Sequence, residues 1–281
     1  MNDYLLRGVT KAGNMRGIAC VTTNLVNEAC RRHHASVTGA VALGRAMTGG
    51  ALMSALLKDD QRLALRFEGN GPLHKILVEA DSGGGVRGCL GNPAVDMFLA
   101  SGKVDVAGAL GRAGFLTVIK DIGLKTPYQS KIQLYSSEIG EDLAYYFTES
   151  EQLPSAVGLV AVPAADGTIA VAGGFLIQSL PPADDALVEA MIDRIGKMAP
   201  LSSFLEQEAG PEGLLAALFA ETPLSMLTRQ ELAFRCTCSS ESVQRVLAAM
   251  GRDEIAAIIA EKGEVEVVCE FCKSRYGFTT V

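Results

Sequence analysis

The sequence predicts an α+β fold with three parts: an N-terminal domain of mixed sheet and helix, a helical linker, and a small C-terminal lobe rich in cysteine. Strand-like runs between residues 1 and 180 are interleaved with a few helical runs, without regular alternation, which favours α+β over α/β. Prolines and amphipathic helical stretches follow from Pro181 onward. Four of the seven cysteines lie in the last 46 residues.

We therefore predict a body at residues 1–180, a linker at 181–231 and a lobe at 232–281. A chain of 281 residues with 48% apolar residues can bury a sizeable core. The net charge of −7 and the modest 20% of charged residues argue against a protein that grips nucleic acid. No apolar run reaches the roughly 18 residues that a membrane helix needs, and no signal-peptide core is present. We expect a cytoplasmic protein that binds neither nucleic acid nor a membrane.

The body is expected to consist of strands joined by turns rich in glycine, asparagine and aspartate, with three helices among them. Asn24 is expected to cap the first helix. The second helix is rich in glycine and alanine, which lets other elements approach closely, so we expect it in the core. The expected strands are 4–9, 18–22, 62–67, 74–80, 86–90, 115–120, 132–135, 158–162 and 169–178, and the expected helices are 24–32, 37–57 and 138–147.

No pattern in the body indicates an active site. Gly108, Gly111 and Gly114 resemble a dinucleotide-binding loop, but their spacing is wrong and no helix-opening pattern follows, so turn glycines are the better interpretation. The phosphate-binding and nucleophile-elbow motifs are absent from the sequence. His33 and His34 are adjacent and point to different faces of a helix, which disfavours a shared metal or catalytic role. We predict that the protein is not an enzyme.

The linker is punctuated by Pro181 and Pro182, and helices with apolar stripes are expected over residues 184–198 and 212–220. Residues 183–231 contain nine acidic and three basic residues, a net −6 of the chain's −7. One interpretation is an ordinary helical connector with a solvated acidic face. The other is a metastable element whose apolar stripes become available when an anchor is lost, because short helices with self-repelling faces are marginal unless docked. Composition alone leaves both open.

The lobe contains two cysteine pairs, Cys236-Thr237-Cys238 and Cys269-Glu270-Phe271-Cys272, with thirty residues between them. Two short pairs held apart by a folded insert suit tetrahedral Zn²⁺, because each pair can donate two thiolates from one turn. We predict one zinc ion per chain, bound in the reduced protein by all four cysteines. Such a site is most often structural. A redox switch is the alternative interpretation, because the cysteines within each pair are close enough to form local disulfides, with some strain for the first pair.

The insert between the pairs is expected to form two helices and a strand, with Ser239 or Ser240 as the first N-cap and glycines 251 and 263 as helix ends. Arg235, Lys273 and Arg275 flank the cysteines, where cations help to keep sulfur ionised. A lobe of about 46 residues buries little core, so metal binding should supply most of its stability. The other cysteines, Cys20, Cys30 and Cys89, are expected to be small buried apolar residues in a reducing compartment.

Several short segments along the chain also resemble segments of a known protein family. In the lobe these are residues 234–239, 263–267 and 269–272, and in the body they are 69–72, 86–88, 91–93, 117–121 and 150–155. With these segments the chain resembles the thirty-three-kilodalton heat-shock chaperonins over nearly its whole length.

This resemblance implies a redox-regulated, ATP-independent holdase that binds unfolding proteins during oxidative stress and prevents their aggregation. It implies an inactive, zinc-bound reduced form. Oxidation would then form the disulfides Cys236–Cys238 and Cys269–Cys272, release zinc, unfold the lobe and linker, and favour a homodimer. Two other classes stay open at this point: a thiol-disulfide oxidoreductase that uses Cys269 and Cys272, and a nucleic-acid-binding zinc ribbon, against which the acidic charge argues.

Overall fold

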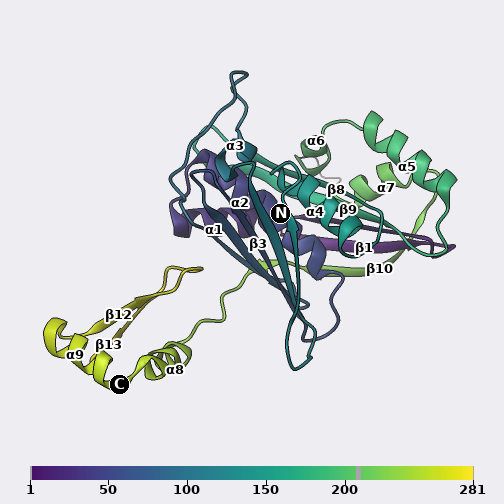
Figure 1. Cartoon of the computed structure of the whole chain (residues 1–281). Helices are drawn as coiled ribbons and strands as arrows, with labels where there is room; N and C mark the ends of the chain where they lie inside the picture. Colours follow the sequence, from purple (N-terminus) through teal and green to yellow (C-terminus); the bar gives the residue numbers. More distant parts are fainter. Residues whose placement is uncertain (1, 207–209, 281) are drawn as a thin grey trace. The chain divides into compact units, whose positions relative to one another are not determined.

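The computed structural model describes residues 2–206 and 210–280, and the chain divides into two compact units, Met1–Phe234 and Arg235–Val281. The larger unit combines two sheets with helices, and the smaller unit combines two helices with a two-stranded sheet (Figure 1). The predicted α+β class is confirmed. Among the described residues, no helix is long and apolar enough to cross a membrane.

The first sheet of the larger unit has five antiparallel strands in the order β10-β1-β2-β9-β8. Because side chains alternate between the faces of a strand, Leu5 contributes to one core while Tyr4 and Leu6 contribute to a second core on the other face. The strands are β1 (Tyr4–Thr10), β2 (Met15–Val21), β8 (Ser155–Pro163), β9 (Ile169–Ser179) and β10 (Leu224–Glu231).

The second sheet has six strands in the order β11-β5-β4-β3-β6-β7, and only the β11–β5 pair is parallel. The strand expected at 132–135 lies earlier, at 128–133, where it pairs with β6. The strands are β3 (Arg62–Gly69), β4 (Lys75–Asp81), β5 (Gly85–Leu90), β6 (Gly114–Asp121), β7 (Tyr128–Gln133) and β11 (Ala233–Phe234).

Helix α2 (Val37–Ser54) is the centre of the main core and contacts strands of both sheets. Sixteen of its 18 residues are buried, so it is enclosed on all sides rather than on one stripe. A Cβ atom at Gly50 would lie 2.7 Å from Cγ1 of Val78, which shows how closely β4 approaches the helix. The prediction of a small-residue core helix is confirmed, although the helix ends at Ser54 rather than at residue 57.

The body contains three further helices, α1 (Thr23–His33), α3 (Val106–Leu110) and α4 (Ile139–Glu149). The expected N-cap, Asn24, lies inside α1. The residue at the N-cap position is Thr22, and its side chain makes no capping hydrogen bond. Instead, the Asp3 carboxylate accepts hydrogen bonds from the backbone amides of Asn24 (3.1 Å) and Leu25 (2.6 Å). The cap is therefore supplied by Asp3, the residue before strand β1, through a contact that local sequence does not reveal.

Gly111 and Gly114, considered above as part of a nucleotide loop, are needed for close backbone packing. Gly111 ends α3 with a φ of +90°, a conformation that favours glycine. A Cβ atom at Gly114 would lie 1.9 Å from the carbonyl oxygen of Glu68 on the neighbouring strand. The turn-glycine interpretation holds for Gly111, whereas Gly114 begins strand β6 and is required by close packing against β3.

The segment assigned as linker packs against the outer face of the five-stranded sheet, where it forms the second core. Helix α7 (Gly210–Leu218) buries Leu214, Leu215 and Leu218, whereas α5 (Asp185–Lys197) buries only Met191. A short helix, α6 (Leu201–Glu206), lies between them in the chain. Residues 224–231, for which no strand was expected, form β10. The proposed division at 180 and 231, and the metastability of this segment, stay predictions.

The smaller unit consists of α8 (Ser240–Met250), α9 (Arg252–Lys262), β12 (Val265–Val268) and β13 (Arg275–Phe278). Ser239 caps α8 by accepting a hydrogen bond from the amide of Ser242, as predicted, and Gly263 ends α9 in a left-handed conformation. Among the side chains that the structure describes here, the buried apolar cluster consists of Leu247, Ile255, Val265 and Phe278, with partly buried side chains packed around it. So small a core agrees with the expectation that another interaction stabilises the unit.

Candidate metal centre

The four cysteines of the lobe converge on one point, although thirty residues separate the two pairs in the sequence. All four sulfur atoms lie within 4.8 Å of one another, and they form the only such group of three or more metal-ligating side chains within residues 2–206 and 210–280. Cys236 Sγ lies 3.5 Å from Cys238 Sγ and 3.7 Å from Cys269 Sγ, and Cys238 Sγ lies 3.3 Å from Cys272 Sγ.

These separations fit a tetrahedral metal site. With Zn–S bonds of about 2.3 Å, the edges of a regular ZnS₄ tetrahedron measure about 3.8 Å. An all-sulfur, tetrahedral set of donors is characteristic of Zn²⁺ rather than of hard ions such as Mg²⁺ or Ca²⁺. The residues present therefore fit the predicted ion, and Cys236, Cys238, Cys269 and Cys272 are the residues that would hold it.

A tight turn between β12 and β13 positions Cys269 and Cys272. The Lys273 amide donates a hydrogen bond to the Cys269 carbonyl (3.0 Å), and the Cys269 amide donates one to the Ser274 carbonyl (2.9 Å). Lys273 has a φ of +60°, the left-handed conformation that glycine adopts most easily. The turn thus places both sulfur atoms on one side at the cost of strain in one lysine.

Cys236 and Cys238 lie in the extended segment between β11 and α8. Residues two apart in an extended chain point to the same face, which lets both sulfur atoms reach the cluster. The N-cap at Ser239 follows directly, so the start of α8 fixes the end of this segment.

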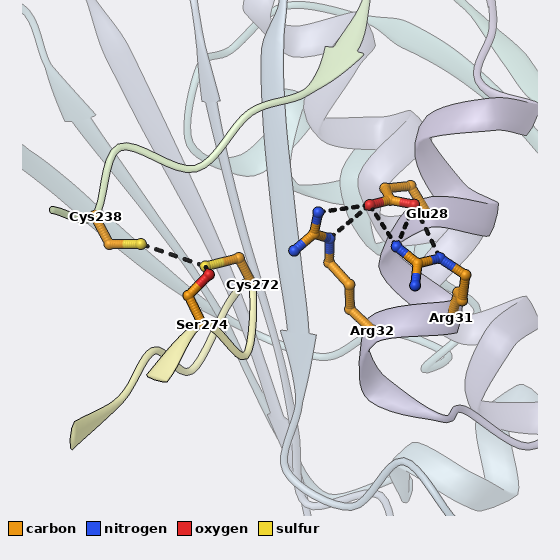
Figure 2. A network of polar contacts seen from close by, with 6 residues as sticks. All are labelled: Glu28, Arg31, Arg32, Cys238, Cys272 and Ser274. Carbon is orange, nitrogen blue, oxygen red and sulfur yellow. Dashed lines mark hydrogen bonds and ion pairs between the residues drawn. The ribbon is translucent and has the colours of Figure 1, made fainter. Parts of the chain in front are cut away.

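The environment shifts the thiol pKa values in opposite directions. Burial raises the pKa of Cys238 to about 12, against the effect of a hydrogen bond with Tyr276. Burial also acts to raise the pKa of Cys272, but hydrogen bonds from the Ser274 hydroxyl and amide outweigh it and lower this pKa to about 6. The sulfur of Cys272 and the hydroxyl of Ser274 are 3.2 Å apart (Figure 2). Burial therefore opposes ionisation of Cys238, whereas the hydrogen bonds around Cys272 favour the thiolate form that binds metal.

Sequence reasoning missed the two hydroxyl groups beside the cluster. The Tyr276 hydroxyl lies 3.1 Å from Cys238 Sγ, and the Ser274 hydroxyl lies beside Cys272. No local pattern signalled them, because the turn at Lys273, where φ is +60°, comes between Cys272 and strand β13. Of the flanking cations, Arg275 forms an ion pair with Glu266 on β12 at 3.0 Å rather than with sulfur.

The three cysteines of the body are unlike those of the lobe. Cys20 and Cys89 are buried and Cys30 is partly buried. Burial raises the pKa of Cys20 well above its usual range and the pKa of Cys30 to about 12. Because a thiolate is the reactive form, this shift of the pKa disfavours reaction of Cys20 and Cys30 at neutral pH.

Comparison with known proteins identifies the family to which this site belongs. The family model described as "Hsp33 protein" matches residues 3–279. The chain belongs to the Hsp33 family. The resemblance inferred from the sequence is therefore confirmed over nearly the full length. The four-sulfur cluster described above lies in the C-terminal lobe of an Hsp33 chain.

Relatives of this Hsp33 chain are similar from end to end. The 33 kDa chaperonin of Geobacter sulfurreducens is 56% identical over 279 residues, which cover 99% of this chain and 93% of the relative. The 33 kDa chaperonin of Bacillus cereus strain B4264 is 42% identical over 280 residues, covering 99% and 96%. The crystal structure of the 33 kDa chaperonin (heat shock protein 33 homolog) from Thermotoga maritima has a TM-score of 0.92 at 36% identity, covering 99% of this chain and 95% of that one.

Proposed function

We propose that this Hsp33 chain is a redox-regulated molecular chaperone that holds unfolding proteins without ATP and catalyses no reaction. The observation that carries the proposal is the convergence of four cysteine sulfur atoms in a lobe whose described buried apolar cluster is small. Because so small a core is insufficient by itself, the folding of the lobe depends on what the sulfur atoms bind. Full-length similarity to proteins named 33 kDa chaperonin supports the chaperone assignment.

In the reduced state, the four lobe cysteines would hold one zinc ion, whose positive charge stabilises the thiolates. Oxidation by peroxide consumes these thiolates. The four thiolates give up four electrons to two molecules of hydrogen peroxide, two sulfur–sulfur bonds form, and four protons are taken up as four waters leave. Sulfur in a disulfide is a poor metal ligand, so the ion is lost and the lobe loses its main stabilising interaction.

We propose that the disulfides are local, Cys236 with Cys238 and Cys269 with Cys272. Sulfur distances in the folded cluster do not select this pairing, because Cys238 is nearer to Cys272 (3.3 Å) than to Cys236 (3.5 Å). Loop closure does favour it, because an unfolding lobe brings near neighbours together more readily than residues more than thirty positions apart. Proteolysis of the oxidised chain followed by peptide mass mapping tests the pairing, and a Cys238–Cys272 linkage would contradict it.

Unfolding of the lobe is coupled to the body through the chain, because β11 and β10 directly precede Arg235. Strand β10 is an edge strand and carries Arg229, which pairs with Glu212 of α7 at 2.6 Å and lies over the Tyr4 ring at 3.7 Å. The Tyr4 hydroxyl in turn donates to Glu212 at 2.5 Å. Displacing β10 removes one member of this group and weakens the attachment of α7.

Release of α7 would expose apolar surface on two sides. The helix would uncover Leu214, Leu215 and Leu218, and the sheet would uncover the side chains of β1 and β2 that now pack against them. Large exposed apolar patches bind other proteins, so we propose this surface as the site for unfolded clients. The same exposed surface favours self-association, and we propose a homodimer as the active form. A reducing cytoplasm is the compartment in which the zinc-bound state would be maintained.

The test combines composition with activity. We expect one zinc and seven free thiols per reduced chain, and no zinc and three free thiols after oxidation with peroxide and mild heat. Oxidised protein should suppress light scattering by an aggregating client, and reduced protein should not. Cys30→Ser, a change at a partly buried body cysteine, is the matched control and should behave as the parent. Equal suppression before and after oxidation would refute the switch, and zinc-free reduced protein that reduces insulin disulfides would favour a thiol oxidoreductase.

A further inference from the structure

Tyr276 connects the sulfur cluster to the apolar core of the lobe. It lies on β13 opposite Val267 of β12, and its ring packs against the buried core of the lobe. Its hydroxyl oxygen lies 3.1 Å from the sulfur of Cys238. The lobe thus contains one side chain that contacts the metal-ligating group at one end and the core at the other.

The direction of this hydrogen bond follows from the chemistry of the ligand. A cysteine that binds metal does so as a thiolate, which has no proton to donate. The Tyr276 hydroxyl must therefore be the donor and Cys238 the acceptor. The Cys272 thiol donates to the Ser274 hydroxyl at 3.2 Å when it carries its proton, but as a metal-binding thiolate it can only accept a hydrogen bond from that hydroxyl. Each cysteine pair consequently has one sulfur with a hydroxyl donor, and donors to ionised acceptors form the stronger class of hydrogen bonds.

We propose that Tyr276 is a positioning residue of the metal centre, with its hydroxyl holding the Cys238 thiolate in place while its ring is anchored in the core. This inference rests on the proposed metal binding by the four cysteines. Four thiolates around one divalent ion leave a net charge of −2, and a donated hydrogen bond withdraws part of that charge from Cys238. The sulfur is thereby held in its binding orientation and made a weaker nucleophile.

The variant Tyr276→Phe isolates the hydroxyl because it keeps the ring. Loss of such a partner of a metal ligand lowers metal affinity by about 10- to 100-fold, and we expect about tenfold because one hydrogen bond is removed. Competition with a chromophoric zinc chelator measures this affinity. Tyr135→Phe is the matched control, since it makes the same chemical change on an exposed tyrosine of the body, and should leave the affinity unchanged.

Alkylation rates resolved by mass spectrometry distinguish positioning from a general structural role. With limiting zinc, Tyr276→Phe should raise the reactivity of Cys238 several-fold relative to Cys236, while Ser274→Ala should act on Cys272 instead. An equal rise at all four cysteines, or no change, would overturn the assignment, and so would unaltered zinc affinity in a variant whose parent binds zinc. A parent protein that binds no zinc would instead refute the proposed function itself.

Discussion

Shortening Leu214 to alanine is expected to release helix α7 from the body and to produce chaperone activity without oxidation. Leu214 is fully buried in the second core, between α7 and the five-stranded sheet. Such large-to-small changes cost about 2–5 kcal/mol, depending on how far the site collapses. Alanine has the highest helix propensity, so the loss comes from packing and not from the helix itself. The equilibrium between docked and released α7 should shift by a factor of about 30 to several thousand.

Amide hydrogen exchange on the reduced, zinc-loaded protein measures this shift. Exchange at residues 210–219 should accelerate by the same factor, because a helix of nine residues is not stable in water once undocked. Light scattering by an aggregating client, measured on the same sample, should fall towards the level seen with oxidised parent. Ile192→Ala is the control, since this side chain on α5 is 65% exposed and its removal should change neither measurement.

Two results would refute the reasoning. Unchanged exchange in α7 would mean that the second core does not hold the helix in place. Faster exchange with no gain in client binding would mean that release of this segment is not what activates the chain, and the linker would then be an ordinary connector.

Four further outcomes are expected. Chelation of zinc should abolish exchange protection in residues 236–278 and leave α2 protected, and a lobe that stays protected would contradict the dependence on metal. Iodoacetamide added to the chelated protein near pH 8 should modify the four lobe cysteines, because loss of the metal unfolds the lobe and ends the burial of its thiols. Cys20 and Cys30 should stay unmodified, because the body remains folded and burial there raises the pKa of both thiols. Labelling of Cys30 at a similar rate would argue against this. Lys273→Gly should stabilise the zinc-bound lobe by about 1 kcal/mol, because Lys273 has a φ of +60°, a conformation that costs energy for lysine but not for glycine. A lower melting temperature of the lobe in this variant would exclude strain at Lys273. Finally, burial acts to raise the pKa of Glu151, but hydrogen bonds from Lys120 and Tyr146 outweigh it and lower this pKa from its usual 4.5. The contribution of Glu151 to stability is therefore present above about pH 4.5 and is lost as the pH falls through the lowered pKa. The urea midpoint of Glu151→Gln should depend less on pH in this range than that of the parent, and an equal dependence would refute this.

The lobe shows how far local sequence reasoning extends. Two short cysteine pairs predict the ligand set because thiolates have few alternative roles at that spacing, and the structure brings all four sulfur atoms together. Ser239 as a cap and Gly263 as a helix end are similarly local, since each acts within a few residues of its own position. Tyr276 and Ser274 were not foreseen, because only the turn at Lys273 and the pairing of β12 with β13 bring their hydroxyls to sulfur.

The body shows the limit of such reasoning. The glycine-rich composition of residues 37–54 was enough to predict a core helix, because small side chains have little other use in a buried helix. The cap supplied by Asp3 was not predictable, since its carboxylate reaches amides more than twenty residues away. The strand at residues 224–231 was also missed, because it is exposed over most of its length and lacks the usual alternation.

By itself, the sequence predicted the fold class from periodicity and the four candidate metal ligands from the spacing of a chemically distinctive residue. The family followed from the resemblance of short segments along the chain to a known family. Only the tertiary structure decided that the acidic segment after residue 180 contributes a second core and an edge strand to the body. It also decided which hydroxyls face the sulfur atoms. Both depend on contacts between residues far apart in the chain, and such contacts leave no local pattern from which they could be inferred.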